Sequence, residues 1–384
     1  MERTSELDCI RRLLAHRRGG TTELAPAPLQ LPVSHYTDPG HFEHERQAVF
    51  RCPPALVALS CDLPEPGSVL PVDIGGVPIL VTRHRDGRVH SFVNACRHRG
   101  SPLVSEAACV KGGRVVCPFH AWTYSTDGRL AAIPLAEEFA GFERSELALR
   151  PRPSLESDGM IFVRAEGDEA IDAAEALAGV GDDLRTLALA NYHRFETRTT
   201  RWSCNWKLLV DTFLESYHVF SLHRETVHPF YSSLPMIYDG WGPNIRFPVA
   251  RRTIDELADV PEEQWRLADH ATVQWLVGAN ALISHTRDYL LLWRFSALGA
   301  GSCEARTTLY CASPIETPAD RERLIGAFDL QLRVTEAEDF PQQQRIQAGL
   351  ESGAVPELLY GRHEVATIHF HNALAARMTG GAAA

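Results

Sequence analysis

The chain has 384 residues, with 49 acidic against 38 basic side chains and a net charge of −11. This acidic balance argues against nucleic acid as the main partner, because phosphate binding needs basic surface. The sequence contains no run of about 18 apolar residues, so no transmembrane helix is predicted. The charged N-terminus lacks the apolar core of a signal peptide, and nine scattered cysteines do not suggest a disulfide framework. We therefore expect a cytoplasmic protein that does not bind a membrane.

The length suggests more than one domain, and the pattern changes along the chain. The first residues predict a short amphipathic helix with Ile10, Leu13 and Leu14 on its inner face. This helix lies in an N-terminal segment, 1–51, that we expect to pack with the second domain. Residues 52–165 predict a small antiparallel β domain, and residues 166–384 form the second domain.

In the first domain, short strands alternate with turn residues. Strands are expected at 77–82, 89–93, 114–116 and 122–125. Asp86-Gly87 marks a tight hairpin turn between the first two.

In the second domain, helices and strands are mixed. Helices are expected at 168–188, at 205–220 and at 318–350, the last kinked near Pro341. Strands are expected at 192–203, 272–277, 282–285, 289–295 and 306–312. The predicted fold class is α+β, in which helices flank an antiparallel sheet.

The strongest local motif is a quartet of two cysteines and two histidines. Cys96-Arg97-His98 is followed, eighteen residues later, by Cys117-Pro118-Phe119-His120. Such a set can hold zinc or an iron–sulfur cluster. Zinc fingers usually group like ligands, whereas each half here supplies one Cys and one His. That alternation favours a [2Fe–2S] cluster in which two imidazoles raise the reduction potential, with structural zinc and coincidence as alternatives.

The sequence around this quartet resembles the Rieske family. The stretches CRHRGSPLV and CPFHAWTY are similar to its paired cluster loops. The resemblance implies that Cys96 and Cys117 bind one iron of the cluster, and that His98 and His120 bind the other.

A second motif lies in NWKLLVDTFLESYHVFSLH, residues 205–223. His218 and His223 are five residues apart, about 140° of rotation on an ideal helix, so the helix must end or distort if both bind one metal. Taken alone, the segment is equally consistent with a helix that has a polar edge and unrelated histidines.

This segment resembles the mononuclear-iron segment of the Rieske non-haem iron oxygenases, whose ring-hydroxylating alpha subunits join a Rieske domain to a helix-grip catalytic domain. The resemblance implies that His218 and His223 bind Fe(II). A carboxylate from the late helix would complete the set; Asp339 is the best match, with Glu336 and Glu338 as competitors. Two histidines and one carboxylate leave open positions on the metal.

Two further carboxylates receive roles from this resemblance. Glu215 would link His218 to the partner subunit's His120 in a head-to-tail homotrimer, unless it is an ordinary surface acid. Most relatives carry Asp there, and Glu is similar to the subgroup that acts on quaternary amines. Asp211 would support a metal ligand through a hydrogen bond.

The expected function is a terminal oxygenase that uses O2 and electrons from a reductase or ferredoxin. Hydroxylation of a small, aromatic substrate is the first expectation, and oxidative C–N or C–O cleavage, such as N-demethylation of a quaternary amine, is the alternative. A Rieske electron carrier and a zinc-stabilised binding module are remote alternatives. Eight aromatic or histidine side chains are candidates for the substrate pocket: Trp202, Phe213, Phe220, Phe230, Tyr231, Trp241, Trp275 and His285. For His363, His369 and His371 we expect packing or surface roles.

Overall fold

The computed structural model describes residues 1–380, and the chain divides into two compact units. Among these residues, one unit contains 50–176 and 189–191, and the other contains 1–49, 177–188 and 192–380. None of the helices in the described part of the chain combines the length and apolarity needed to span a bilayer. The first unit is built from strands and the second from a large sheet with helices, so the predicted α+β class is confirmed.

The smaller unit contains three antiparallel sheets. Their strand orders are β10-β5-β4-β3-β6, β11-β12-β2 and β7-β8-β9. The strands are β2 (Pro54–Leu59), β3 (Ser68–Ile74), β4 (Val77–Arg83), β5 (Val89–Val93), β6 (Ala108–Cys109), β7 (Arg114–Val116), β8 (Thr123–Ser125), β9 (Leu130–Ala132), β10 (Pro151–Arg152), β11 (Ser154–Ser157) and β12 (Met160–Arg164).

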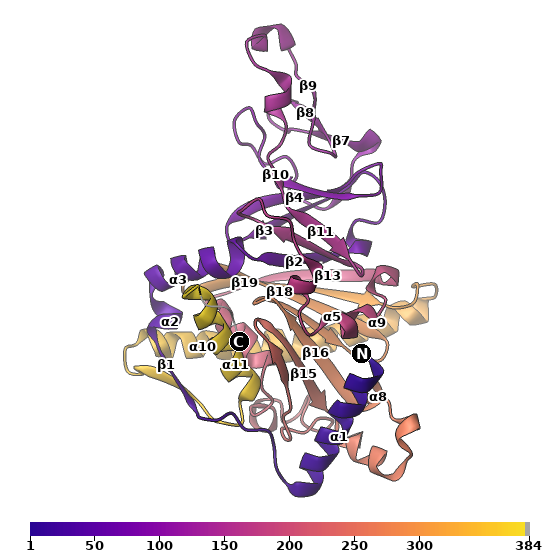
Figure 1. Cartoon of the computed structure of the whole chain (residues 1–384), viewed down its shortest axis with the longest axis vertical. Helices are drawn as coiled ribbons and strands as arrows, with labels where there is room; N and C mark the ends of the chain where they lie inside the picture. Colours follow the sequence, from indigo (N-terminus) through magenta and orange to yellow (C-terminus); the bar gives the residue numbers. More distant parts are fainter. Residues whose placement is uncertain (381–384) are drawn as a thin grey trace. The chain divides into compact units, whose positions relative to one another are not determined.

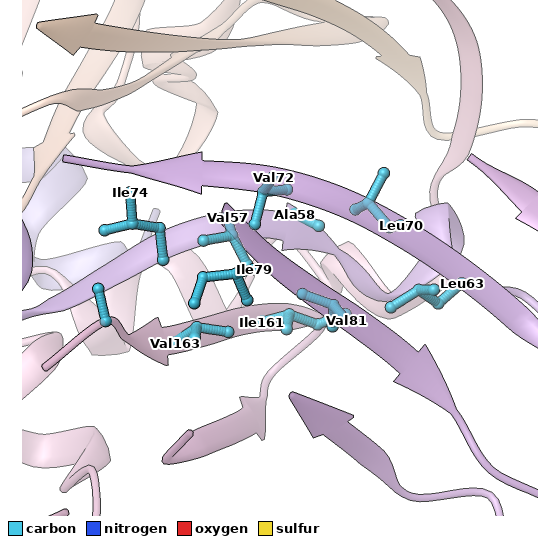
Figure 2. Close-up of a cluster of buried hydrophobic side chains, with 11 residues drawn as sticks. Val57, Ala58, Leu63, Leu70, Val72, Ile74, Ile79, Val81, Ile161 and Val163 are labelled. Carbon is cyan, nitrogen blue, oxygen red and sulfur yellow. The ribbon is translucent and has the colours of Figure 1, made fainter. Parts of the chain in front are cut away.

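The core of this unit lies between its first two sheets. Figure 2 shows aliphatic side chains from β2, β3, β4 and β12 that point toward one another, among them Val57, Val72, Ile79 and Ile161. Those of β3, β4 and β12 come from alternate positions of their strands, because successive side chains in a strand point to opposite faces. The β7-β8-β9 sheet packs in a second cluster of buried residues that includes Cys96 and Cys117.

The larger unit contains a seven-stranded antiparallel sheet in the order β13-β19-β18-β17-β16-β15-β14. Figure 1 shows β15, β16, β18 and β19 in this sheet. Its strands are β13 (His193–Trp202), β14 (Asp239–Trp241), β15 (Asn244–Ala250), β16 (Ala271–Val277), β17 (Ala281–His285), β18 (Tyr289–Gly299) and β19 (Ser302–Cys311). The five strands predicted for this half are confirmed within a few residues. A separate pair joins β1 (Leu29–Pro32) to β20 (Glu357–Tyr360).

This unit also contains helices, most of them in the N-terminal segment and in the later part of the chain. The main ones are α1 (Arg3–Gly19), α6 (Trp206–Phe213), α7 (Val219–Leu222), α9 (Pro318–Leu332), α10 (Phe340–Glu351) and α11 (Val365–Met378), with shorter turns at α2 (Ser34–Thr37), α3 (Pro39–Glu45), α5 (Gly181–Arg185) and α8 (Leu267–His270). The inner face predicted for the first helix is confirmed, since Ile10, Leu13 and Leu14 are buried.

The continuous helix predicted at 168–188 is wrong. Only α4 (Ala173–Ala176) and α5 form, separated by Gly179, whose φ is +73°. A Cβ at this glycine would lie 2.0 Å from the ring of Trp241, so the chain turns there to let the indole approach. The alanine-rich composition predicted one helix, but packing of Gly179 against Trp241, a residue distant in the sequence, interrupts it.

The helix predicted at 205–220 is also too long. It begins as expected, with the side chain of Asn205 accepting a hydrogen bond from the backbone N–H of Lys207, and it ends at Phe213. The following residues form a loop and then the single turn of α7. By contrast, the late helix is interrupted close to Pro341, as predicted: a π-helical segment, Arg333–Asp339, joins α9 to α10.

We predict that Leu282→Ala in β17, where the side chain is 1% exposed, lowers the free energy of unfolding by about 2–5 kcal/mol. The neighbouring strand offers a control, since Leu298 of β18 is 47% exposed, and Leu298→Ala should cost less than about 0.5 kcal/mol. Denaturant unfolding followed by circular dichroism measures both. Equal losses in the two variants would contradict the assigned sheet face.

Candidate functional site

The four residues of the Cys/His quartet lie together at one side of the smaller unit. Cys96 and Cys117 are each 3% exposed, whereas His98 and His120 are half-buried. The two imidazole rings lie with their centroids 4.6 Å apart. The quartet therefore combines two buried thiols with two imidazoles nearer the surface.

Two similar turns bring these side chains together. The backbone N–H of Gly100 donates to the carbonyl of Cys96 at 2.8 Å, and that of Ala121 donates to the carbonyl of Cys117 at 3.1 Å. Both closing residues have positive φ, which glycine adopts freely and Ala121 adopts at a cost. The hydroxyl of Tyr124 lies 3.4 Å from Cys96 Sγ and also accepts from the backbone of the first loop.

The electrostatics of the quartet suit a metal cluster. Burial opposes ionisation of Cys117, but backbone N–H groups of Phe119 and His120 outweigh it and lower the pKa of the thiol. The Nδ1 atom of His98 is buried without a hydrogen-bond partner, although its ring stacks on Trp122. A buried imidazole nitrogen without a hydrogen-bond partner, beside two cysteines of which Cys117 has a lowered pKa, fits a bound iron–sulfur cluster.

His218, His223 and Asp339 converge in the larger unit. Each offers one ligand atom, and these atoms all lie within 4.8 Å of one another. His223 Nε2 lies 2.9 Å from Asp339 Oδ1, and His218 Nε2 lies 3.6 Å from the same oxygen. His223 and Asp339 are 2% and 3% exposed. This two-histidine, one-carboxylate arrangement can hold a metal ion on one face and leave other positions open.

A second carboxylate stands behind each imidazole. Glu215 bonds to His218 Nδ1, and Glu338 Oε2 lies 2.6 Å from His223 Nδ1. Each carboxylate leaves the Nε2 atom of its histidine directed toward Asp339. Such partners select the tautomer that leaves Nε2 free and make the imidazole a stronger ligand.

The role of Glu338 was not foreseen. The sequence makes Glu338 a competitor of Asp339 for the metal. In the structure its carboxylate contacts Nδ1 of His223, the ring nitrogen that does not face Asp339, and also accepts a hydrogen bond from the hydroxyl of Thr226 at 2.7 Å. The adjacent pair Glu338-Asp339 was the available signal. On a regular helix, neighbours point about 100° apart, and nothing in the sequence indicated that both reach one ring.

Local backbone geometry accounts for both halves of this arrangement. His218 and His223 lie at the two ends of the one-turn helix α7, so the short helix spans the interval between them. Glu338 and Asp339 end the π-helical segment that precedes α10. Wider π turns commonly occur at functional sites, where they re-aim side chains that a regular helix would direct elsewhere.

The pKa values of all three triad residues are raised. Burial works against charge on His218 and His223, but the hydrogen bonds and charges of Glu215, Asp339 and Glu338 outweigh it and raise the pKa of both histidines. Burial raises the pKa of Asp339. Its Oδ1 atom has no hydrogen bond of ordinary geometry. A dication that takes the place of these protons satisfies all three groups, so the residues fit a mononuclear metal.

Asp211 lies on α6, four residues before Glu215. Its carboxylate accepts hydrogen bonds from the hydroxyls of Tyr36 and Tyr360, at 2.8 and 3.1 Å, and lies 2.9 Å from His371 Nε2. These contacts tie α6 to the N-terminal segment, β20 and α11. They differ from the expected hydrogen bond to a metal ligand.

A pocket of about 580 Å³ opens beside the triad, within the larger unit. Of the eight predicted lining residues, Phe213, Phe230 and Tyr231 do line it. The remaining five, Trp202, Phe220, Trp241, Trp275 and His285, are not among its walls. His371 and His369 have packing roles, as expected: the former binds Asp211, and Nε2 of the latter lies 2.9 Å from the carbonyl of Gly242.

Comparison with known families agrees with this pair of sites. Residues 54–143 match the model of the Rieske [2Fe–2S] domain, and residues 189–380 match the catalytic domain of the ring-hydroxylating alpha subunit. The chain belongs to the family of Rieske oxygenase alpha subunits. Its cofactors are accordingly a [2Fe–2S] cluster and a mononuclear iron, and the zinc alternative is excluded.

The curated relatives include two kinds of quaternary ammonium oxygenase. The chain is 37% identical over 197 residues to a glycine betaine monooxygenase oxygenase subunit of Pseudomonas aeruginosa, covering 51% of this chain and 45% of the relative. It is 34% identical over 200 residues to the carnitine monooxygenase oxygenase subunit of Escherichia coli, covering 50% and 52%. The matched region thus spans about half the length of these relatives.

Solved structures resemble nearly the whole chain in fold. The quaternary ammonium Rieske monooxygenase CntA superposes with a TM-score of 0.79 at 20% identity, over 92% of this chain and 96% of that one. Naphthalene 1,2-dioxygenase from Rhodococcus sp. superposes with a TM-score of 0.76 at 19% identity, over 97% and 98%.

We predict that Glu338→Ala weakens iron binding by roughly 10- to 100-fold, because His223 loses the group that orients it. Glu338→Gln should fall between this variant and the native protein, since the amide oxygen still accepts from Nδ1. Competition with a ferrous chelator measures the affinity. Glu336→Ala is the matched control, because Glu336 binds Arg198 and none of the triad. An unchanged affinity in Glu338→Ala would refute the orienting role.

Proposed function

We propose that this chain is the terminal oxygenase component of a Rieske system that oxidises a small organic molecule with O2. One observation supports this above all: Nε2 of His218, Nε2 of His223 and a carboxylate oxygen of Asp339 converge beside a pocket of substrate size. When bound, a ferrous ion with open positions activates O2, and the cluster supplies electrons singly. An electron carrier would need neither the triad nor the pocket.

The protein's own residues would then position the reactants. His218, His223 and Asp339 would hold the metal, while Glu215 and Glu338 keep both imidazoles in the liganding tautomer. The apolar part of the pocket, which includes Phe213 and Val227, would limit access of water to the reacting centre. Cys96, His98, Cys117 and His120 would bind the cluster.

Electron transfer between the two sites would use Glu215. Its carboxylate bonds to His218, and its side chain is 14% exposed, so one edge stays accessible. A contact from Glu215 to the partner subunit's His120, in a homotrimer, would join a cluster to the iron of the next subunit. A reductase or ferredoxin would supply the electrons.

Among substrate classes, oxidative cleavage of a C–N bond in a quaternary amine now has the stronger support. The relatives that match this chain include glycine betaine and carnitine monooxygenases. The charge around the triad points the same way. When ionised, Glu215, Glu338 and Asp339 carry three negative charges against two positive charges on a ferrous ion, which leaves one negative charge beside the pocket.

Hydroxylation of an aromatic compound is the second candidate. The pocket wall includes Phe213, Val219, Phe230 and Leu330, which suit a flat apolar ring as well as the methyl groups of a quaternary amine.

We predict that His218→Ala abolishes oxidation of every substrate while leaving the visible spectrum of the cluster unchanged. The assay supplies a surrogate reductase and screens quaternary amines against aromatic acids, with product detected by mass spectrometry. His16→Ala, which changes a half-buried histidine of α1 outside the pocket lining, serves as the control and should retain turnover. Turnover in His218→Ala would refute the oxygenase proposal.

The bridging role of Glu215 has a separate test. We predict that Glu215→Gln slows the O2-dependent reoxidation of a reduced cluster by about tenfold or more, equivalent to about 1.4 kcal/mol in the barrier. Stopped-flow absorbance of the cluster follows this rate, and iron analysis checks that the metal is retained. Native reoxidation kinetics in a variant with full iron content would eliminate Glu215 as the bridge.

A further inference from the structure

Arg251 places an unpaired positive charge in the wall of the substrate pocket. It directly follows β15, and its side chain is half-buried. Its Nε atom is buried without a hydrogen-bond partner. Within residues 1–380, no carboxylate lies within 4.0 Å of its guanidinium. A buried nitrogen donor normally has a hydrogen-bond partner, and the described residues supply none for this Nε atom, so a ligand in the pocket would satisfy it.

The neighbouring charged groups are already satisfied. Arg252, the next residue, also lines the pocket, but its side chain donates to the carbonyl of His228 at 3.1 Å. Asp269, an acid on the pocket wall, lies 3.3 Å from Arg287. Arg246, earlier in β15, pairs with both Asp183 and Asp239 at 2.8 Å. Among these side chains only Arg251 lacks a partner.

The surroundings hold Arg251 in position. Its backbone N–H donates to the carbonyl of His270 at 2.8 Å, and its backbone forms an antiparallel bridge with Tyr231. The guanidinium lies over the ring of Tyr231, 5.5 Å from the centroid, and that ring is fixed by a 2.8 Å hydrogen bond between its hydroxyl and Thr272. A guanidinium stacked on a fixed ring is oriented before any ligand arrives, which reduces the entropy cost of binding.

The adjoining strand adds polar groups to the same wall. Thr272 and Gln274 alternate with buried apolar residues on β16, so both face the pocket. The side-chain oxygen of Gln274 is buried and also has no partner. The sheet therefore forms a polar wall around Arg251, while the triad comes from α7 and the π-helical segment. The pocket thus has a cationic group on its sheet side and the carboxylates of Glu215 and Asp339 beside the two histidines.

From this arrangement we infer that the substrate carries a carboxylate that binds Arg251, while the group to be oxidised lies at the His218, His223 and Asp339 triad. The inference rests on the proposed oxygenase function and narrows its substrate class. A planar guanidinium can hold a carboxylate through two parallel hydrogen bonds. A zwitterion with an ammonium group at one end matches both charges of the pocket. An aromatic acid matches the arginine alone.

Two matched pairs of compounds test the inference by calorimetric titration of the purified holoenzyme. Glycine betaine is compared with choline, and benzoate with benzyl alcohol. In each pair the carboxylate of the acid is replaced by a hydroxymethyl group in the alcohol. We expect at least one acid to bind the native protein more tightly than its alcohol. Arg251→Gln should weaken binding of that acid by roughly ten- to hundredfold and leave the alcohol unchanged. Arg251→Lys, which keeps the charge but not the planar fork, should be intermediate.

Arg266→Gln is the matched control, because it removes the same charge from an exposed side chain that contacts only backbone carbonyls. It should leave all four affinities unchanged. Cluster absorbance and iron content confirm that each variant is folded and loaded. Preference for glycine betaine identifies a zwitterionic substrate, and preference for benzoate an aromatic acid.

The inference is overturned if neither acid binds the native protein more tightly than it binds Arg251→Gln. It is also overturned if acid and alcohol lose affinity equally. Binding is measured without turnover, so failure of this inference can be distinguished from failure of the oxygenase proposal. The oxygenase proposal fails if His218→Ala remains active.

Discussion

The catalytic half of this protein depends on two imidazoles that turn the same nitrogen toward one carboxylate. His218 and His223 both direct Nε2 at Oδ1 of Asp339, and each is held from behind through Nδ1 by a second carboxylate. Turning these ligand atoms toward one point in a protein interior is unfavourable unless a proton or a cation lies between them. The rest of the unit is arranged so that this set of donors forms in spite of that cost.

Two departures from regular helix make the convergence possible. The end of α6 at Phe213 frees the chain to form α7, whose two ends carry the histidines. The π-helical segment before α10 lets consecutive residues reach opposite nitrogens of His223. Asp211 also ties α6 to the N-terminal segment through a hydrogen bond from Tyr36. Irregular backbone at the ligands is thus supported by regular, well-packed elements around them.

The sheet contributes further residues to the wall of the pocket, and their chemistry differs from that of the residues around the triad. Period-two alternation sends Thr272 and Gln274 toward the pocket, and Arg251 follows the neighbouring strand. The separation of a cation on the sheet from anions beside the metal gives the pocket a direction. A substrate bound through charge at one end would present its other end to the iron, which links the pocket's electrostatics to the site of oxidation.

The sequence alone determined the parts that local spacing controls. The alternating Cys/His pairs, the hairpin at Asp86-Gly87, five of the seven strands of the larger sheet and the interruption near Pro341 follow from neighbouring residues, because turn chemistry and side-chain period act over a few positions. Family resemblance added His218, His223 and Asp339. Tertiary structure alone decided the orienting role of Glu338, the contacts of Asp211, the break at Gly179 opposite Trp241 and the unpaired charge of Arg251. Each of these depends on residues far apart in the chain, and local patterns carry no information about which distant side chain will lie within hydrogen-bond reach.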